Sequence, residues 1–226
     1  CDIETDGLDA SVIWCAVCRY NNVNTVICNE RDFKDYVANL PEATWVFHNG
    51  IGFDVPVLNR LWGVAFDKSN VCDTLVCSRL SDPSRSGGHS LRNWGNILGF
   101  AKGDHSDWSR LTPEMIDYCI RDTELTQAVH ESLQAELEGF SEESIKLEHE
   151  VQWVIQQQER NGWLLDQRLA FSLCGTFKEK MNGIETKLQE VFPPIVEERW
   201  SDKTGKRLKD KVTVFKPGSR QQVAER

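Results

Sequence analysis

The sequence predicts an α/β protein in which helices flank a mixed sheet, followed by a mostly helical region. Strand-like runs come first: residues 11–28 are rich in Val, Ile, Cys and Tyr around an Asn21-Asn22 turn, and a short apolar run covers 44–47. Apolar residues then recur at helical spacing over 53–62, 91–98 and 112–139. Strands first, with helices between and after them, favour this fold class.

Start and stop signals define the helices and a domain boundary. Thr112 before Pro113 is a strong helix start, and Gly139 ends that helix. Composition changes there, which predicts a first domain over 1–140 and a second over 141–226. Ser141 and Asp166 are expected to cap two long helices, and the apolar face of the first contains Leu147, Val151, Val154 and Ile155. A β-like stretch follows at 212–215.

Charge is distributed unevenly along the chain. The net charge is −9, which argues against a nucleic-acid partner. Residues 1–140 contain 21 acidic and 11 basic residues, whereas the tail from Arg199 onward contains nine basic and three acidic ones. An acidic half that concentrates divalent cations, joined to a basic tail that follows a phosphate backbone, suits a nuclease. A solvated surface is the alternative.

Cysteine usage and hydropathy indicate a cytoplasmic protein. No apolar stretch approaches the roughly 18 residues of a membrane helix, and no leader precedes the first motif, so we expect no membrane partner. Among eight cysteines, Cys15 and Cys18 form a close pair. A metal or redox motif is one interpretation, but residues three apart in a strand face opposite ways and no second Cys/His pair follows at zinc spacing. Buried free thiols are the favoured interpretation.

Four acids and a tyrosine are the candidate catalytic residues. Asp2 and Glu4 lie two apart in a strand, so both carboxylates project from one face. Asp54 stands at the start of a helix after a strand and loop. Asp122 and Tyr118 are one turn apart and share a helix face.

Such a set fits hydrolysis of a phosphodiester with two metal ions. Mg²⁺ and Mn²⁺ prefer oxygen ligands, and two ions about 4 Å apart stabilise both the attacking and the leaving oxygen. A phenol can orient the attacking water. Taken singly, each residue has a structural interpretation, such as a helix cap for Asp54 or an exposed strand end for Asp2 and Glu4.

Three segments resemble the motifs of proofreading exonucleases. Residues 2–8 (DIETDGL) are similar to the first motif, 48–54 (HNGIGFD) to the second and 118–122 (YCIRD) to the third in its tyrosine form. The segments 72–80 and 88–91 are similar to those of family A DNA polymerases of podovirus-type bacteriophages. Residues 148–163 resemble the start of the polymerase region, and 215–220 the segment toward its thumb.

The resemblance implies an RNase H-like fold for 1–140 and a DEDDy-type 3′→5′ exonuclease acting on single-stranded DNA 3′ ends. It implies a first metal ion on Asp2, Glu4 and Asp122, a second shared by Asp2 and Asp54, and a water positioned by Tyr118. Leu8 is expected to wedge against the terminal base, with Thr5, Asn49 and Phe53 near the last nucleotides. Core packing is the alternative for Leu8 and Phe53, and loop capping for Asn49.

Implied partners are primer-template DNA, the remainder of a polymerase chain and a processivity factor, in a host-cell cytoplasm. The first-motif strand of the family begins upstream of residue 1, so a truncated central strand is expected, with a free amino group beside Asp2. We expect no polymerase catalytic centre in these residues. His89 is interpreted as a neighbour of a helix cap rather than a phosphate ligand, and Asp73 as a cap.

Two other functions remain open at this point. One is a stand-alone RNase D-like exonuclease acting on RNA, which the polymerase-like second half disfavours. The other is a non-catalytic nucleic-acid-binding module, whose signature would be a missing acid. None of the four acids is missing.

Overall fold

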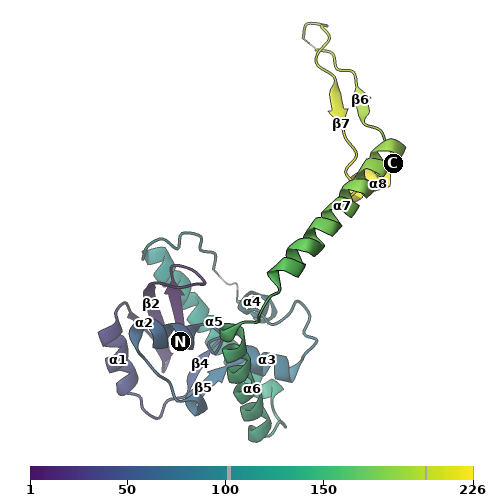
Figure 1. Ribbon diagram of the computed structural model, residues 1–226. Coiled ribbons are helices and arrows are strands. Elements are labelled where there is room, and N and C mark those ends of the chain that lie inside the picture. The colour runs from purple at the N-terminus through teal and green to yellow at the C-terminus, as the bar shows by residue number, and fades with distance from the viewer. Residues whose placement is uncertain (101–102, 202, 226) are drawn as a thin grey trace. The chain divides into compact units, whose positions relative to one another are not determined.

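The computed structural model describes residues 1–100, 103–201 and 203–225, and confirms a mixed α/β chain with small sheets and many helices (Figure 1). Two compact units are present, Cys1–Gly162 and Trp163–Arg226. The division therefore falls later than the boundary at 140 expected from composition. The reason is that the helix after Ser141 packs on the first unit.

The first sheet is an antiparallel meander in the order β1-β2-β3. It consists of β1 (Asp2–Thr5), β2 (Ile13–Tyr20) and β3 (Val23–Ile27). Asn21 and Asn22 have positive φ angles of 48° and 62°, which asparagine tolerates better than most residues and which suit a tight hairpin. The predicted strand pair over 11–28 is therefore confirmed.

The second sheet pairs β4 (Trp45–Phe47) with β5 (Val71–Asp73) in parallel. Over the described residues the strands form separate small sheets, so the expected single mixed sheet is not observed. The two sheets approach each other where the amino group of Cys1 donates to the carbonyl of Val46 at 2.8 Å. Among the described residues, β1 pairs with β2 alone and forms no ladder with β4.

Five helices complete the core of the first unit. They are α1 (Glu30–Ala38), α2 (Asp54–Trp62), α3 (Thr74–Ser81), α4 (Leu91–Leu98) and α5 (Pro113–Glu136), and a short 3-10 turn η1 (Lys68–Asn70) precedes β5. Thr112 caps α5 through its side chain, as the sequence predicts. One apolar cluster joins both sheets to α1 and α2 around Phe33, Phe47 and Leu58, and another joins α3, α4 and α5 around Trp94.

The helix α6 (Glu142–Asn161) begins after the Ser141 cap but uses a different face from the one predicted. Leu147, Val151, Val154 and Ile155 are all exposed. The buried residues of α6 are His149 and Gln156. The predicted apolar face is therefore not the face that packs on the core. Ile145 and Trp153 of α6 pack against the two apolar clusters instead, beside the buried His149 and Gln156.

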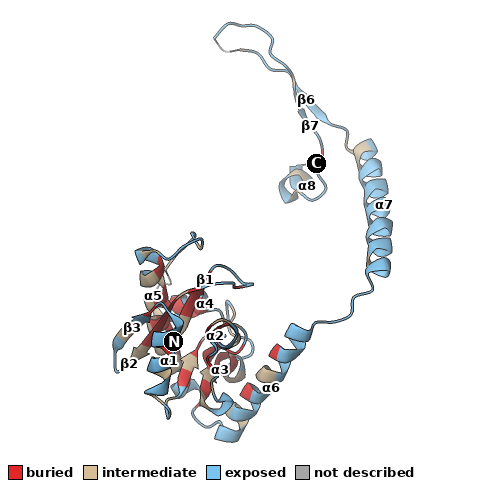
Figure 2. Cartoon of the chain, turned by 60° about the vertical axis from the view of Figure 1, so that its left-hand side comes forward, coloured by how far each residue is buried: buried red, intermediate tan, exposed pale blue. Residues whose placement is uncertain are grey.

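The second unit consists of α7 (Gln167–Val191), β6 (Ile195–Glu197), β7 (Lys211–Thr213) and α8 (Arg220–Glu225). No residue of α7 is buried, and Figure 2 shows the helix almost entirely in the exposed colour. Phe215 is buried against Phe192, with ring centroids 4.7 Å apart. The β-like stretch predicted at 212–215 begins and ends slightly earlier, at 211 and 213.

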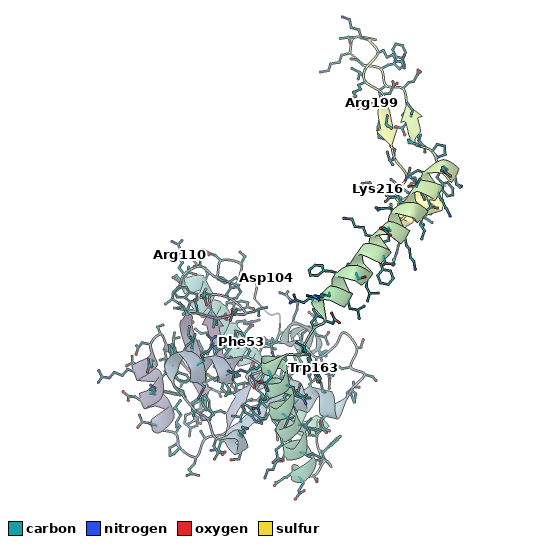
Figure 3. All side chains as sticks on the ribbon, in the orientation of Figure 1. Phe53, Asp104, Arg110, Trp163, Arg199 and Lys216 are labelled. Atoms are coloured by element: carbon teal, nitrogen blue, oxygen red, sulfur yellow. The ribbon has the colours of Figure 1, made fainter. Side chains whose placement is uncertain are left out.

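The basic tail lies in this second unit, where Figure 3 labels Arg199 and Lys216. Part of its charge is neutralised locally. Arg207 lies 3.3 Å from Glu198 and 3.2 Å from Asp210, and Lys211 lies 3.0 Å from Glu197. These pairs are exposed, so they stabilise the hairpin only slightly. In the described part of the chain, no helix combines the length and the apolar character that crossing a bilayer requires.

Candidate functional site

The carboxylates of the first motif lie on β1. Asp2 pairs with Val17 and Glu4 with Cys15 on β2, and the register shifts between Glu4 and Thr5. Glu4 is buried and Asp2 half-buried. Because alternate residues of a strand face the same side, the strand sets both carboxylates on one face of the sheet.

Asp54 is positioned by a loop that a second carboxylate organises. The side chain of Asp73 accepts hydrogen bonds from the backbone N–H groups of Asn49, Ile51 and Leu75 at 2.8, 3.0 and 3.0 Å. Asp73 therefore caps α3, as predicted, and also holds the loop that precedes α2. The buried Asp54 then accepts from the backbone N–H of Ile3 at 3.2 Å, which ties the second motif to β1.

Asp122 reaches the same place from α5, which packs on β1 and β2. One turn earlier, the thiol of Cys119 lies 3.6 Å from Oδ2 of Asp2. One residue later, the hydroxyl of Thr123 donates to the carbonyl of Val17 at 3.4 Å. These contacts on either side of Asp122 fix the face of α5 that carries it, and Asp122 is buried.

The electrostatics show that the four acids act on one another. Burial raises the pKa of Glu4 to about 10, and the charges of Asp2, Asp122 and Asp54 act in the same direction. Burial and Asp2 likewise raise the pKa of Asp54, whereas the N-terminal amino group opposes this effect. The structure therefore brings together the four acids that the sequence singled out, in an arrangement that repels itself when all are ionised.

Tyr118 lies one turn before Asp122 on α5, within an aromatic cluster. Its ring centroid is 5.8 Å from that of Trp108 and 5.9 Å from that of His105. The indole N–H of Trp14 donates to the carbonyl of Trp108 at 3.1 Å, which fixes the loop that carries Trp108 to β2. Tyr118 is half-buried and lines neither of the two cavities described next.

Two cavities open beside β1. One, of about 480 Å³, is lined by Asp2 and Asp122 together with further residues from the second motif, α3 and the start of α4: His48, Asn49, Leu75, Arg79, His89, Ser90 and Leu91. The other, of about 390 Å³, is lined by Ile3, Glu4, Thr5, Gly7, Leu8, Phe53 and Trp108. The first has basic and polar walls, and the second is mostly apolar. Asp2 of β1 lines the first cavity, and Glu4 of β1 lines the second.

The predicted nucleotide contacts divide between these cavities. Thr5, Leu8 and Phe53 line the apolar one, and Asn49 lines the polar one. Leu8 is 93% exposed, so its packing in the core is excluded. Phe53 packs partly against the core, and Asn49 has a left-handed φ of 66° in the loop, so both also have structural roles.

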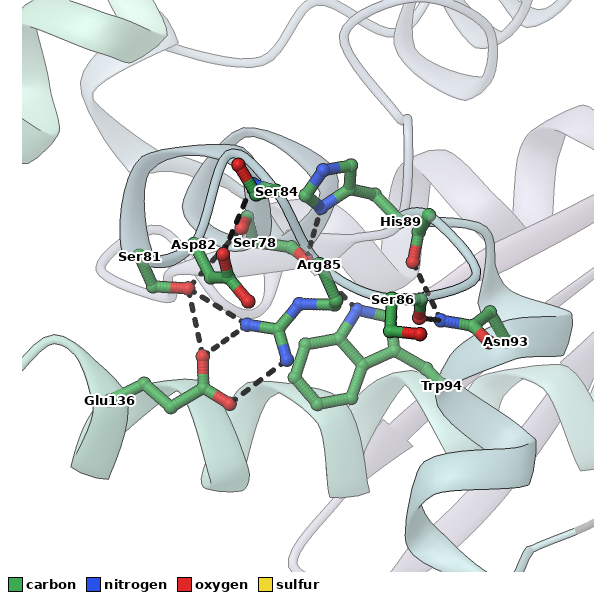
Figure 4. A network of polar contacts seen from close by, with 11 residues as sticks. Ser78, Ser81, Asp82, Ser84, Arg85, Ser86, His89, Asn93, Trp94 and Glu136 are labelled. Atoms are coloured by element: carbon green, nitrogen blue, oxygen red, sulfur yellow. Dashed lines mark hydrogen bonds and ion pairs between the residues drawn. The ribbon is translucent and has the colours of Figure 1, made fainter.

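His89 lines the polar cavity although the sequence assigned it to a helix start. Figure 4 shows its ring beside Ser78: Nδ1 lies 2.9 Å from the Ser78 hydroxyl, which also accepts from the indole N–H of Trp94 at 3.1 Å. If the hydroxyl donates to Nδ1, the neutral ring carries its proton on Nε2. Trp108 lies outside every segment that the sequence singled out, so only the folded chain reveals it as a cavity residue. Arg79 lies in the segment 72–80, but no role was predicted for it and its place in the polar cavity follows only from the fold.

Metal-ligand geometry is also present at this site. Ligand atoms of Asp2, Glu4 and Cys119 lie within 4.8 Å of one another. A second group of this kind contains Cys72, Cys77 and His149. By contrast, Cys15 and Cys18 belong to different apolar clusters on the two sides of β2, which confirms that they face opposite ways as buried thiols.

Comparison with known proteins places this chain near DNA polymerases. No family model matches it. Two curated DNA-directed DNA polymerases are distantly similar over most of its length. One, from Escherichia phage T7, is 27% identical over 257 aligned residues that cover 84% of this chain and 36% of the polymerase. The other, from Enterobacteria phage T3, is 27% identical over 205 residues, 65% of this chain and 29% of the polymerase. The chain thus spans about a third of the length of these relatives.

Proposed function

We propose that the chain is a metal-dependent 3′→5′ exonuclease that removes terminal nucleotides from single-stranded DNA, as the proofreading part of a phage family A DNA polymerase. One observation carries this proposal. Asp2, Glu4, Asp54 and Asp122 come from three separate elements, β1, α2 and α5, and three of them are buried while their charges act on one another. A fold keeps such carboxylates together at a cost in stability, which a catalytic role explains.

The residues present fit two divalent ions. Carboxylate oxygens are the hard donors that Mg²⁺ or Mn²⁺ requires, and a bound cation would displace the protons that the raised pKa values of Glu4 and Asp54 favour. Asp2, Glu4 and Asp122 would hold one ion, and Asp2 with Asp54 the other. When bound, the two ions would stabilise the attacking and leaving oxygens of the phosphodiester.

The chain's own residues would bind and orient the strand end. Leu8, Phe53 and Trp108 give the apolar cavity the character of a base-binding site, since aromatic and apolar surfaces stack on any base. Arg79 and His89 line the cavity that contains Asp2 and Asp122, where a phosphate would need neutralisation. Tyr118, which packs edge to face against Trp108, would orient the attacking water through its phenol.

The similarity to phage polymerases favours DNA over RNA as the substrate. It also supports an RNase H-like domain followed by the start of a polymerase region. The antiparallel order β1-β2-β3 beside the parallel pair β4-β5 is compatible with such a sheet in two parts. Primer-template DNA, the remaining polymerase chain and a processivity factor are the partners that this proposal includes.

Cleavage of end-labelled oligonucleotides tests the proposal. Single-stranded DNA labelled at its 5′ end should shorten one nucleotide at a time with Mg²⁺ or Mn²⁺, and should stay intact with EDTA. Asp122→Asn should lower the rate at least about a hundredfold because a metal ligand is lost. Asp117→Asn is the matched control, since Asp117 is an exposed acid on the same helix.

Three results would decide against parts of the proposal. Faster cleavage of a matched RNA oligonucleotide would favour the RNase D-like function, because discrimination would then rest on the 2′-hydroxyl. Binding of DNA that EDTA does not affect, without cleavage at any metal concentration, would favour a non-catalytic binding module. An equal loss of activity in Asp117→Asn and Asp122→Asn would assign the effect to the helix rather than to the site.

A further inference from the structure

A group of thiols and imidazoles lies around β5 and α3, and the proposed function makes no use of it. Cys72 is the middle residue of β5, Cys77 lies in α3, His130 in α5 and His149 in α6. The sulfur of Cys72 is 4.0 Å from that of Cys77 and 3.9 Å from Nδ1 of His130. Ligand atoms of Cys72, Cys77 and His149 lie within 4.8 Å of one another.

We propose that Cys72, Cys77, His130 and His149 form a structural zinc site. Two thiolates and two imidazoles are the soft and intermediate donors that select Zn²⁺ over Mg²⁺. In a tetrahedral site with Zn–S bonds of about 2.3 Å, two sulfurs lie about 3.8 Å apart. The 4.0 Å between the two sulfurs is close to that value, so the two sulfurs need little movement to share one ion.

The site would join four elements that are distant in sequence. His149 already attaches α6 to the core: its Nε2 accepts from the backbone N–H of Asp73 at 2.9 Å, and its Nδ1 lies 2.8 Å from the carbonyl of Ile145. A bound ion would take the Nε2 lone pair in place of that N–H group. The Nδ1–H to carbonyl bond is the outer hydrogen bond that commonly orients a metal-binding histidine.

Two simpler interpretations compete with a zinc site. Cys72 and Cys77 are free thiols here, and buried free cysteines are common as small apolar residues. A disulfide between them would require their sulfurs to approach from 4.0 Å to about 2.0 Å. Neither interpretation explains why imidazoles from both α5 and α6 lie beside these cysteines, with His130 next to Cys72 and His149 near both sulfurs.

Metal analysis of the whole chain tests the proposal. The protein is purified under reducing conditions, stripped of metal with a chelator, and titrated with Zn²⁺ and, separately, with Co²⁺. The measurements are made in the Cys119→Ser protein. This substitution removes the thiol next to Asp2, so any sulfur-to-cobalt absorption that remains comes from other cysteines. Cys77→Ser and His130→Gln remove proposed ligands, and Cys28→Ser and Cys174→Ser, both at exposed positions, are the matched controls.

The expected result is a tightly bound Zn²⁺ in addition to any ions that the four acids hold, a sulfur-to-cobalt band in the Co²⁺ form, and a higher melting temperature with zinc than without. Cys77→Ser should abolish both the cobalt band and the zinc-dependent rise in melting temperature, and His130→Gln should weaken zinc binding at least about tenfold. Cys28→Ser and Cys174→Ser should keep the band and the rise. Folding of each variant is checked by circular dichroism. The proposal is overturned if the folded Cys119→Ser protein gives no sulfur-to-cobalt band, if Cys77→Ser keeps it, or if a Cys72–Cys77 disulfide forms under the reducing conditions used.

Discussion

Replacing Glu4 by glutamine is expected to stabilise the metal-free protein while removing a metal ligand. Glu4 is buried, and its pKa is raised from 4.5 to about 10, first by burial and then by Asp2 and the other acids. At pH 7 the folded chain therefore holds a proton there that the unfolded chain releases. Glutamine has nearly the same shape and needs no proton, so the substitution removes the free-energy cost of protonating this side chain on folding.

The magnitude follows from linkage. Each pH unit above 4.5 makes the protonated folded chain less favourable by about 1.4 kcal/mol relative to the ionised unfolded chain. The upper limit of the gain in unfolding free energy at pH 7 is therefore about 3 kcal/mol. Because a carboxyl with a raised pKa loses its stabilising contribution as pH rises from 4.5 toward 10, the advantage of glutamine should fall below about 1 kcal/mol at pH 5. We expect a gain of about 1 to 3 kcal/mol at pH 7.

Urea unfolding in EDTA, followed by tryptophan fluorescence at pH 5 and pH 7, measures this gain. Glu42→Gln, at an exposed position, is the control and should change little. Excess Mg²⁺ should narrow the gap at pH 7, because an ion bound by the wild-type acids stabilises only the folded wild type. The reasoning is refuted if the variant gains nothing at pH 7, or gains the same amount at both pH values.

Substitutions at three further positions test DNA binding, loop structure and turn geometry. Trp108→Ala should weaken binding of single-stranded DNA, measured by fluorescence anisotropy, by about 1 to 3 kcal/mol, and unchanged affinity would exclude a base contact. Asp73→Ala should lower the free energy of unfolding by at least about 2 kcal/mol, since three backbone N–H groups lose their acceptor, and a smaller loss would mean that water replaces it. Asn22→Gly should leave the stability unchanged or raise it, because glycine adopts a positive φ freely. Asn22→Val should lower the free energy of unfolding by about 1 kcal/mol or more, because φ is 62° at this position. Equal melting temperatures for the two variants would contradict the turn geometry.

The sequence by itself determined the local features of this protein. The hairpin at Asn21-Asn22 and the caps at Thr112, Ser141 and Asp166 depend on neighbouring residues, so short patterns suffice to predict them. The four acids could be selected for the same reason, since each stands in a recognisable motif on a predicted strand, loop or helix.

Only the tertiary structure decided which groups meet across the fold. The mixed sheet appears in two parts, and α6 turns His149, Ile145 and Trp153 toward the core rather than the predicted apolar face. Trp108 and Arg79 enter the cavities, and the Cys72 cluster assembles, through contacts between residues far apart in sequence. No periodicity or spacing encodes such contacts, because they depend on how whole elements pack and on which buried polar groups find partners.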